Sequence, residues 1–317
     1  MRVVPVLFPC DLGHHNRGEY KTGGERGAPD VLLDLLEGEG VRLARPRAVP
    51  VEVPPEPDDP DAILKFDALL TKALHALAEV VASVNSDADF PLVLGGDHTT
   101  MCGHVLGHSE RHEAGIGLAV LADARADLAS PAPPVYDDAV RLRKDAEVTR
   151  DGGASRMALS GALRLLDDQT AFGRAMKASA VQSQYTSVVG VRARPWAQMK
   201  PQEKRAKIDI WTMERLEFDG ESTYRSMLTR HLSAGPIVLS IDVGGLDPDL
   251  MHAIREPVID GLDWSFLKRT LEQCVPHVDR ILGLDICEVD PSREAGHRQS
   301  LTRFAETIAP FLKRLTR

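Results

Sequence analysis

The sequence predicts an α/β protein built on a mainly parallel sheet that is buried on both faces. Short runs of β-branched and aliphatic residues recur along the chain, and they are continuous rather than alternating with polar residues. Continuous apolar runs are typical of strands that are covered on two sides. Segments with helical periodicity separate these runs, and this alternation indicates parallel strands joined by helices.

Six strands and six helices are expected. The strands are expected at residues 3–7, 92–94, 117–121, 187–191, 237–241 and 281–286. The helices are expected at residues 28–36, 61–84, 99–107, 155–166, 264–274 and 300–315. The clearest helix is the one at 61–84, where apolar side chains from Ile63 to Val81 form one stripe behind an acidic start that follows a proline.

One domain over residues 1–317 is the expected organisation. A chain of 317 residues, 43% of them hydrophobic, can bury a substantial core, and we find no internal repeat. The proline-rich stretch at 54–60 is interpreted as a stiff surface connection between a strand and a helix. A second such stretch, at 131–134, is expected to form a long irregular loop over the edge of the sheet.

Charge and cysteine content exclude several classes of partner. The chain has 38 Lys and Arg against 47 Asp and Glu, a net charge of -9, so nucleic acid is not an expected partner. No apolar run approaches the roughly 20 residues that span a bilayer, so no membrane partner is expected. The cysteines form no C-x-x-C motif, and no secretory signal is evident. These features predict a cytoplasmic protein with reduced, buried thiols at Cys10, Cys102, Cys274 and Cys287.

Three acidic stretches stand where expected strands end. They are GGDH at 95–98, DARAD at 123–127 and SIDVGGLDP at 240–248. Because ligands of open parallel sheets bind at the carboxyl ends of the strands, we expect these side chains to converge. Carboxylate oxygens with one imidazole suit Mn²⁺ or a similar divalent cation better than a thiolate-seeking metal.

Five motifs in a fixed order make the chain resemble the ureohydrolase family, which comprises arginases, agmatinases and formimidoylglutamases. They are GGDHT at 95–99, where the family has GGDHS, DARAD at 123–127 for DAHxD, SIDVGGLDP at 240–248 for SxDxDxxDP, Pro257 and Gly261-Leu262 for GTPxxGGL, and GLDICEVDP at 283–291 for LDIxEVNP. The stretch GGERGAP at 23–29 also resembles the family's glycine-rich opening. One such motif is weak evidence, but five in order are specific.

The resemblance implies a three-layer α/β/α fold with a parallel sheet of about eight strands, assembled as a trimer or hexamer. It also implies a binuclear Mn²⁺ centre that activates water to attack the carbon of a guanidinium or amidinium group, because two cations depress the pKa of bound water. A small guanidino or amidino compound is therefore the expected partner.

The implied metal centre is incomplete in this chain. The residues that match the ligands of one ion of the family pair are all present: His98, Asp123, Asp127 and Asp242. The two ligands that belong to the other ion alone correspond to Arg125 and Gly244. A guanidinium cannot ligate a metal, and glycine has no side chain to do so.

Two arrangements would balance the remaining carboxylates, and the sequence leaves both open. In the first, a single ion binds the four retained ligands while Arg125 enters the vacant second position as a tethered positive charge. In the second, Arg125 alone neutralises the carboxylates and no metal binds. Some cation is required, because converging carboxylates raise one another's pKa. The expected cofactor is at most one Mn²⁺ ion.

Positions that match the family's substrate contacts also differ. The HG motif falls on Arg156-Met157, the threonine of GTP on Glu256, and the GLRDVD motif on residues 190–195, where the acids that hold an amino group are gone. Glu288, which faces the substrate guanidinium in the family, is retained. Arginine is therefore a poor candidate substrate. A ligand with an anionic end is expected instead, held by charge-assisted contacts from Arg156, Arg192 or Arg194.

Two functions are consistent with these residues. The first is a hydrolase acting on linear amidines, with Arg125, Asp127 and Glu288 as candidate catalytic residues and Glu256 beside Glu288 in the substrate site. The second is a catalytically inactive protein of the same fold with a ligand-binding, regulatory or assembly role, since fold does not fix function.

Structural roles are the alternative for several of these residues. For Arg192 and Arg194, ion pairing on a loop is as good an interpretation as ligand binding. For Glu288, the alternative is a structural salt bridge to Arg125 or another arginine. The histidines outside the motifs are interpreted as solvated or packed; they are His14, His15, His104, His108 and His112.

Overall fold

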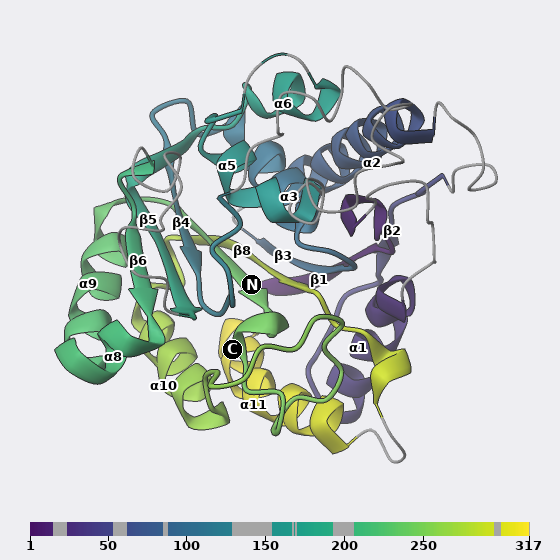
Figure 1. Cartoon of the computed structure of the whole chain (residues 1–317). Coiled ribbons are helices and arrows are strands. Elements are labelled where there is room, and N and C mark those ends of the chain that lie inside the picture. Colours follow the sequence, from purple (N-terminus) through teal and green to yellow (C-terminus); the bar gives the residue numbers. More distant parts are fainter. Residues whose placement is uncertain are drawn as a thin grey trace, which may run out of the picture.

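The centre of the molecule is one sheet of eight parallel strands in the order β2-β1-β3-β8-β7-β4-β5-β6 (Figure 1). The computed structural model describes residues 1–14, 24–52, 62–84, 88–128, 154–166, 168, 170–192, 206–294 and 299–316. The strands are β1 Arg2–Phe8, β2 Arg47–Ala48, β3 Asp89–Gly95, β4 Ile116–Val120, β5 Val181–Val191, β6 Asp209–Thr212, β7 Ile237–Asp242 and β8 Ile281–Cys287. The predicted parallel sheet is confirmed.

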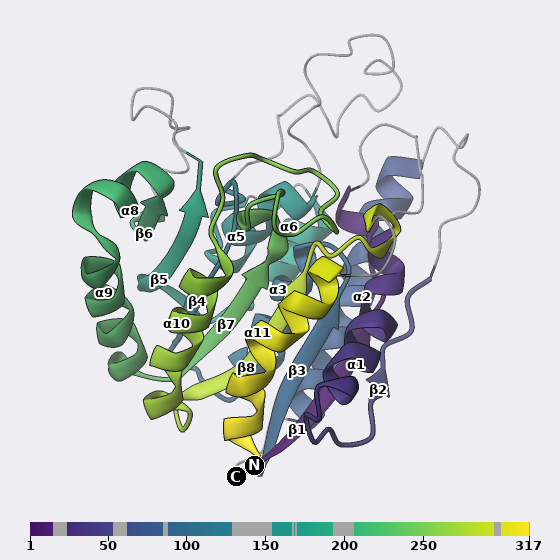
Figure 2. The ribbon, with the colours of Figure 1, turned by 90° about the horizontal axis from the view of Figure 1, so that it is seen from below.

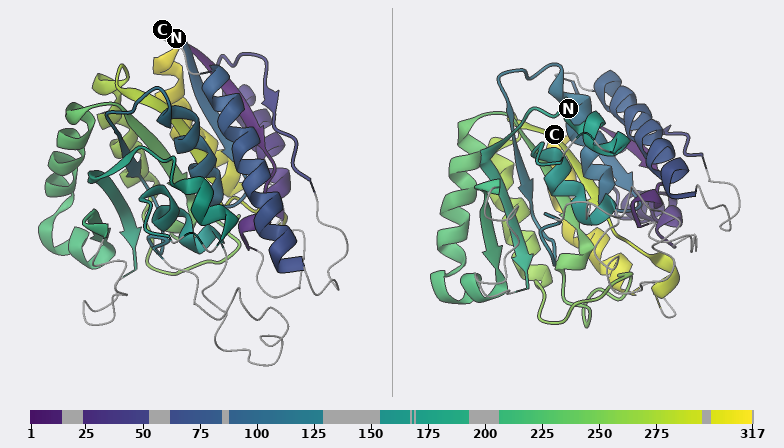
Figure 3. Two further views of the ribbon diagram at one scale, coloured as in Figure 1. Left: turned by 90° about the horizontal axis from the view of Figure 1, so that it is seen from above. Right: turned by 45° about the horizontal axis from the view of Figure 1, so that its top comes forward.

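Helices cover both faces of this sheet, as the continuous apolar strands predict. The helices are α1 Ala28–Gly38, α2 Ala62–Val84, α3 Thr99–Ser109, α5 Ala158–Ala162, α6 Ala171–Met176, α8 Met213–Asp219, α9 Glu221–Ala234, α10 Trp264–Cys274 and α11 Gln299–Leu315. Figure 2 shows α1, α9, α10 and α11 on one face, and the left view of Figure 3 shows α2 and α3 across the other. The three-layer α/β/α architecture is therefore confirmed.

The predicted elements match the observed ones where apolar patterning is strong. The helix expected at 264–274 is α10, whose Asp263 cap accepts a hydrogen bond from Phe266 N at 2.6 Å. The helix expected at 155–166 is wrong in its extent: a short 3-10 turn, η3 Ala154–Met157, leads into α5, which ends at Ala162. Arg164 has φ 59°, a left-handed conformation that a continuing helix cannot contain.

Elements with weak patterns were not predicted. The two sheet edges, β2 and β6, are too short to show an apolar run, and α8 has no buried residue. Several predictions lie outside the described residues, namely the stretches at 54–60 and 131–134, together with His15 and Arg194. Among the helices that the structure describes, none is both long and apolar enough to cross a bilayer.

The sheet order places the acidic stretches side by side. Strands β3, β8, β7 and β4 are consecutive neighbours at the middle of the sheet. Because all four run in the same direction, the segments that follow them emerge at one edge. These segments carry the motifs at 95–98, 123–127 and 240–248, as well as Glu288.

Candidate metal centre

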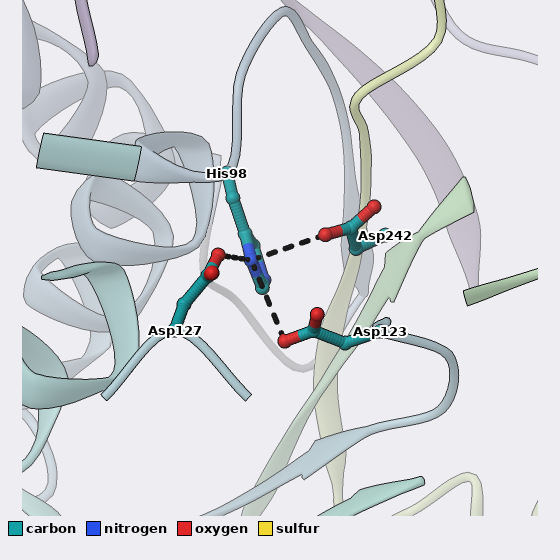
Figure 4. A group of neighbouring side chains, drawn as sticks. All are labelled: His98, Asp123, Asp127 and Asp242. Atoms are coloured by element: carbon teal, nitrogen blue, oxygen red, sulfur yellow. Dashed lines mark hydrogen bonds and ion pairs between the residues drawn. The ribbon is translucent and has the colours of Figure 1, made fainter. Parts of the chain in front are cut away.

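Four buried side chains meet at this carboxyl edge (Figure 4). His98 Nδ1 lies 2.7 Å from Asp127 Oδ2, 3.4 Å from Asp242 Oδ2 and 3.9 Å from Asp123 Oδ2. One ligand atom of each residue lies within 4.8 Å of those of the other three, and no side chain of the group is more than 8% exposed. The structure thus brings together the complete set of ligands that the sequence suggested for one ion.

Tight backbone geometry positions His98. A Cβ at Gly96 would lie 2.1 Å from the carbonyl oxygen of Cys10, so only glycine allows the loop after β3 to pack against the segment after β1. Asp97 holds the two segments together, because its carboxylate accepts hydrogen bonds from Thr99 N at 2.8 Å and Gly13 N at 2.7 Å.

Unusual backbone conformations position two acidic residues. Asp127 has φ 41° and Glu288 has φ 63°, in the left-handed region that side chains other than glycine rarely adopt. These turns bring the Asp127 carboxylate to His98 Nδ1 and the Glu288 carboxylate to the backbone N–H of His98, which donates to Glu288 Oε1 at 2.8 Å. Backbone strain of this kind is concentrated at functional sites.

The electrostatics of the group fit a divalent cation. Burial and the neighbouring Asp127 raise the pKa of Asp123 to about 7, and burial also raises the pKa of Asp242 well above its usual value. Among the described residues, Asp123 Oδ2 is buried without a hydrogen-bond partner, which is costly for a carboxylate. Three crowded carboxylates beside one imidazole are a set of donors that a bound divalent ion would stabilise.

Arg125 lines the same pocket as the aspartates and pairs there with a glutamate. Its Nη1 donates to Glu256 Oε2 at 2.5 Å, and the backbone N–H of Arg125 donates to Asp123 Oδ1 at 2.7 Å. In the part of the chain that the structure describes, its guanidinium forms no ion pair with the three aspartates of the cluster. Glu256, on the neighbouring loop, offers a partner with less burial. Arg125 therefore does not neutralise the three carboxylates by ion pairing, which corrects the arrangement in which Arg125 alone balances them. Its entry into the second metal position stays a prediction, since Arg125 lines the same pocket.

Glu288 is paired with a histidine rather than with an arginine. His14 Nε2 lies 2.9 Å from Glu288 Oε2 and 3.7 Å from Glu25 Oε1, and His14 Nδ1 lies 3.4 Å from Ser155 Oγ. Burial opposes the charge on His14, but Glu288, Asp97 and Glu25 together outweigh it and raise the pKa of His14 to about 9. Burial likewise opposes the charge on Glu288, yet His14 lowers the pKa of this carboxyl group to about 2. The pair is therefore ionised at neutral pH.

His14 and Glu25 are site residues that the sequence analysis missed. His14 lines the same pocket as Asp123, Asp127 and Asp242, so its interpretation as merely solvated or packed is corrected. The available signal was its position: His14 closes η1, Leu12–His14, just after β1, at the same sheet edge as the other motifs. Glu25 lies in the glycine-rich stretch at 23–29 and is fully buried.

Arg192 serves the architecture of the pocket. Its guanidinium donates six hydrogen bonds to backbone carbonyls, and these all belong to the segments around Gly190, 244–246 and 258–259. This clamp joins the loop after β7 to the loop that carries Glu256. The structure thus does not present Arg192 to a ligand as expected, whereas Arg156 and Glu256 do line the pocket.

Replacing Arg192 with Met is expected to destabilise the fold by about 3 kcal/mol, because several carbonyls lose their donor while the apolar stem is kept. Urea unfolding monitored by circular dichroism measures this change. Arg303→Met is the control, since Arg303 pairs with Glu306 on an exposed helix surface, where such pairs contribute little. Equal losses for the two variants would contradict a structural role for Arg192.

The remaining predicted features are packed in the core. All four cysteines are free and buried, which confirms the expectation of buried thiols. Burial also raises the pKa of Cys287 well above its usual value. His104 and His108 are buried, and His104 Nδ1 lies 2.7 Å from Asp285 Oδ2. Their packed interpretation is confirmed.

Comparisons with known proteins agree with this fold. The family model described as "Arginase family" matches residues 3–311, and the chain belongs to the arginase family. It is 28% identical to human arginase-1 over 293 residues, 87% of this chain and 83% of that protein, and 29% identical to bovine arginase-1 over 247 residues, 74% and 69% of the two chains.

Solved structures show the same fold at lower identity. An arginase from Bacillus cereus has a TM-score of 0.75 at 20% identity and covers 99% of this chain and 98% of its own. An Entamoeba histolytica arginase in complex with L-ornithine has a TM-score of 0.74 at 18% identity, with 98% and 97% covered. A hypothetical agmatinase from Burkholderia thailandensis has a TM-score of 0.65 at 16% identity, with 99% and 85% covered.

Proposed function

We propose that this protein hydrolyses a C–N bond of a guanidino or amidino compound other than arginine, using one divalent ion, Mn²⁺, at the His98 cluster. The proposal includes a cytoplasmic location, from the cysteine pattern, and assembly as a trimer or hexamer, from the family resemblance. Support comes from a single observation: His98, Asp123, Asp127 and Asp242 converge, and the three aspartates line a pocket. By the family resemblance, the positions of the other ion's own ligands fall on Arg125 and Gly244.

The ligand set and the pocket have separate roles in this proposal. His98, Asp123, Asp127 and Asp242 would hold the ion, which supplies Lewis-acid activation of water when bound. Glu288 lies beside them and would bind the positive guanidinium or amidinium group of the substrate. Its carboxylate is fixed by His98 N and His14 Nε2, so it meets the substrate without reorganising.

His14 is placed to supply a proton. When the C–O bond forms and the C–N bond breaks, the leaving nitrogen needs a proton, and the His14 imidazolium can donate one and regain the one that water releases. It is charged at neutral pH because Glu288 and Glu25 contact it and Asp97 lies near. This would be general acid catalysis by a residue of the pocket.

Replacing His14 with Asn is expected to lower kcat by about 100-fold or more, since general acid catalysis contributes on that order. The rate of the unmodified protein should fall as pH rises through about 9, because the imidazolium then loses its proton. The variant should lose this alkaline decline and keep its metal content. A pH profile of kcat with metal analysis measures both.

The matched control is His252→Asn, which changes an exposed histidine near the pocket loop. It should leave the pH profile unchanged. Loss of metal in His14→Asn would instead make His14 a metal ligand, because His14, Glu25 and Glu288 are also close enough to hold an ion. An unchanged kcat would remove His14 from the reaction.

Metal analysis and a substrate screen test the proposed function directly. After purification with Mn²⁺, we expect about one ion per chain, and release of urea or ammonia from at least one guanidino or amidino compound. Metal with turnover supports the hydrolase. Absence of both supports the catalytically inactive alternative, which the missing ligands at Arg125 and Gly244 favour.

A further inference from the structure

Two arginines and one glutamate form a compact group on the wall of the pocket. Glu256 Oε2 accepts from Arg125 Nη1 at 2.5 Å and also pairs with Arg156 Nη2. The side chains of Arg125, Arg156 and Glu256 are 29%, 22% and 42% exposed. The carboxylate is thus the most accessible member of the group, and the two guanidinium groups are held more deeply.

The three residues come from separate segments that differ in how firmly they are held. Arg125 follows β4, and its backbone N–H is fixed by Asp123. Arg156 lies in η3 between the buried residues Ser155 and Met157. Glu256 lies in the loop between Ile254 and Leu262, which Arg192 holds at the carbonyls of Val258 and Ile259. The Glu256 side chain is the most exposed of the three, so it can turn away from the arginines while the backbone of its loop stays in place.

We propose that Arg125 and Arg156 form a carboxylate-binding subsite, in which Glu256 stands where the carboxylate of the ligand binds. The Glu256 pair shares one oxygen between two guanidinium groups. A ligand carboxylate would bring two oxygens, one for each arginine, and charge-assisted bonds of this kind are strong and directional. The arginines also lower the pKa of Glu256 despite its burial, so both partners of the exchange are anions.

The rest of the pocket defines the other end of this ligand. The same pocket is lined by Asp123, Asp127, Asp242 and Glu288, and it contains about 360 Å³ of space, part of it open to solvent. Its acidic floor suits a cationic group and its arginine wall suits an anionic group. The ligand class is therefore an amidino or guanidino acid, a small molecule with one of these groups at one end and a carboxylate at the other.

This inference rests on the proposed function only in placing the ligand in this pocket, so binding rather than turnover tests it. Isothermal titration of the Mn²⁺-treated protein would use a series of ω-guanidino acids and alkylguanidines of matching chain length. The acids should bind more tightly. Glu256→Gln should raise the affinity for the acids by about tenfold, since it removes the competing anion from two partly exposed pairs, and should leave the alkylguanidines unchanged.

Matched variants separate this model from a general charge effect. Asp260→Asn removes an exposed acid from the same loop and should leave all affinities unchanged. Arg156→Gln should abolish the preference for acids, and thermal unfolding verifies that each variant is folded. Tighter acid binding by Glu256→Gln supports the subsite even where no compound is hydrolysed. An unchanged or weaker affinity, or an equal gain for alkylguanidines, overturns it even where neutral amidines are hydrolysed.

Discussion

The Asp242→Asn variant should lose its divalent ion and, with it, hydrolytic activity. Asn keeps the shape of the side chain and can still accept the hydrogen bond that Gly244 N donates to Asp242 Oδ1 at 2.7 Å. It cannot supply the anionic oxygen near His98. Changes outside the ligand set of a metal already cost up to about 100-fold in affinity, so the loss of a ligand from a site with one ion should exceed this. Metal titration and turnover measure the effect.

The Asp242→Asn variant should lose metal but should not lose stability in its metal-free form. Asp242 is buried among carboxylates and its pKa is raised, so its ionised form destabilises the metal-free fold at neutral pH. Removal of the charge should therefore leave the metal-free protein at least as stable as before. Asp249→Asn, which changes an exposed acid after the same strand, is the control and should retain metal and activity. Retention of one tightly bound ion by Asp242→Asn would show that the cluster is not the metal site.

The double variant Arg125→His with Gly244→Asp should raise the metal content from one toward two ions per chain. It restores an imidazole and a carboxylate at the two positions where the family resemblance places the ligands specific to the second ion. It also releases Glu256 from Arg125, which now pairs with it. Turnover should rise as well, because a second cation lowers the pKa of bound water further. Metal analysis by plasma emission with activity assays measures both.

Local geometry allows this change. A Cβ at Gly244 would lie 2.9 Å from Asp242 Oδ1, so the Asp242 carboxylate must shift slightly, as a side-chain end can. The single variants serve as controls, since each restores only one ligand. A double variant that folds but still binds one ion would contradict the mapping of the second site onto these two positions.

The sequence predicted the fold best for strands that are buried on both faces, because such strands are continuous apolar runs. The middle strands β3, β4, β7 and β8 are almost wholly buried, so their apolar runs are continuous and readable. The edge strands β2 and β6 lack such runs. The four members of the metal cluster were readable for a related reason: each lies in a motif directly after or within one of those buried strands.

What the sequence by itself determined was the parallel sheet and the edge at which the acidic motifs gather, because these depend on residue type and on order along the chain. The family resemblance added the prediction that Arg125 and Gly244 replace the second ion's own ligands. The tertiary structure alone decided the pairings. In the fold, Arg125 pairs with Glu256, and His14 pairs with Glu288. All six hydrogen bonds of the Arg192 guanidinium go to backbone carbonyls. Apart from the bond between Arg192 and Gly190, these contacts join residues from 52 to 274 positions apart. Which charge meets which depends on loop packing that no local pattern records.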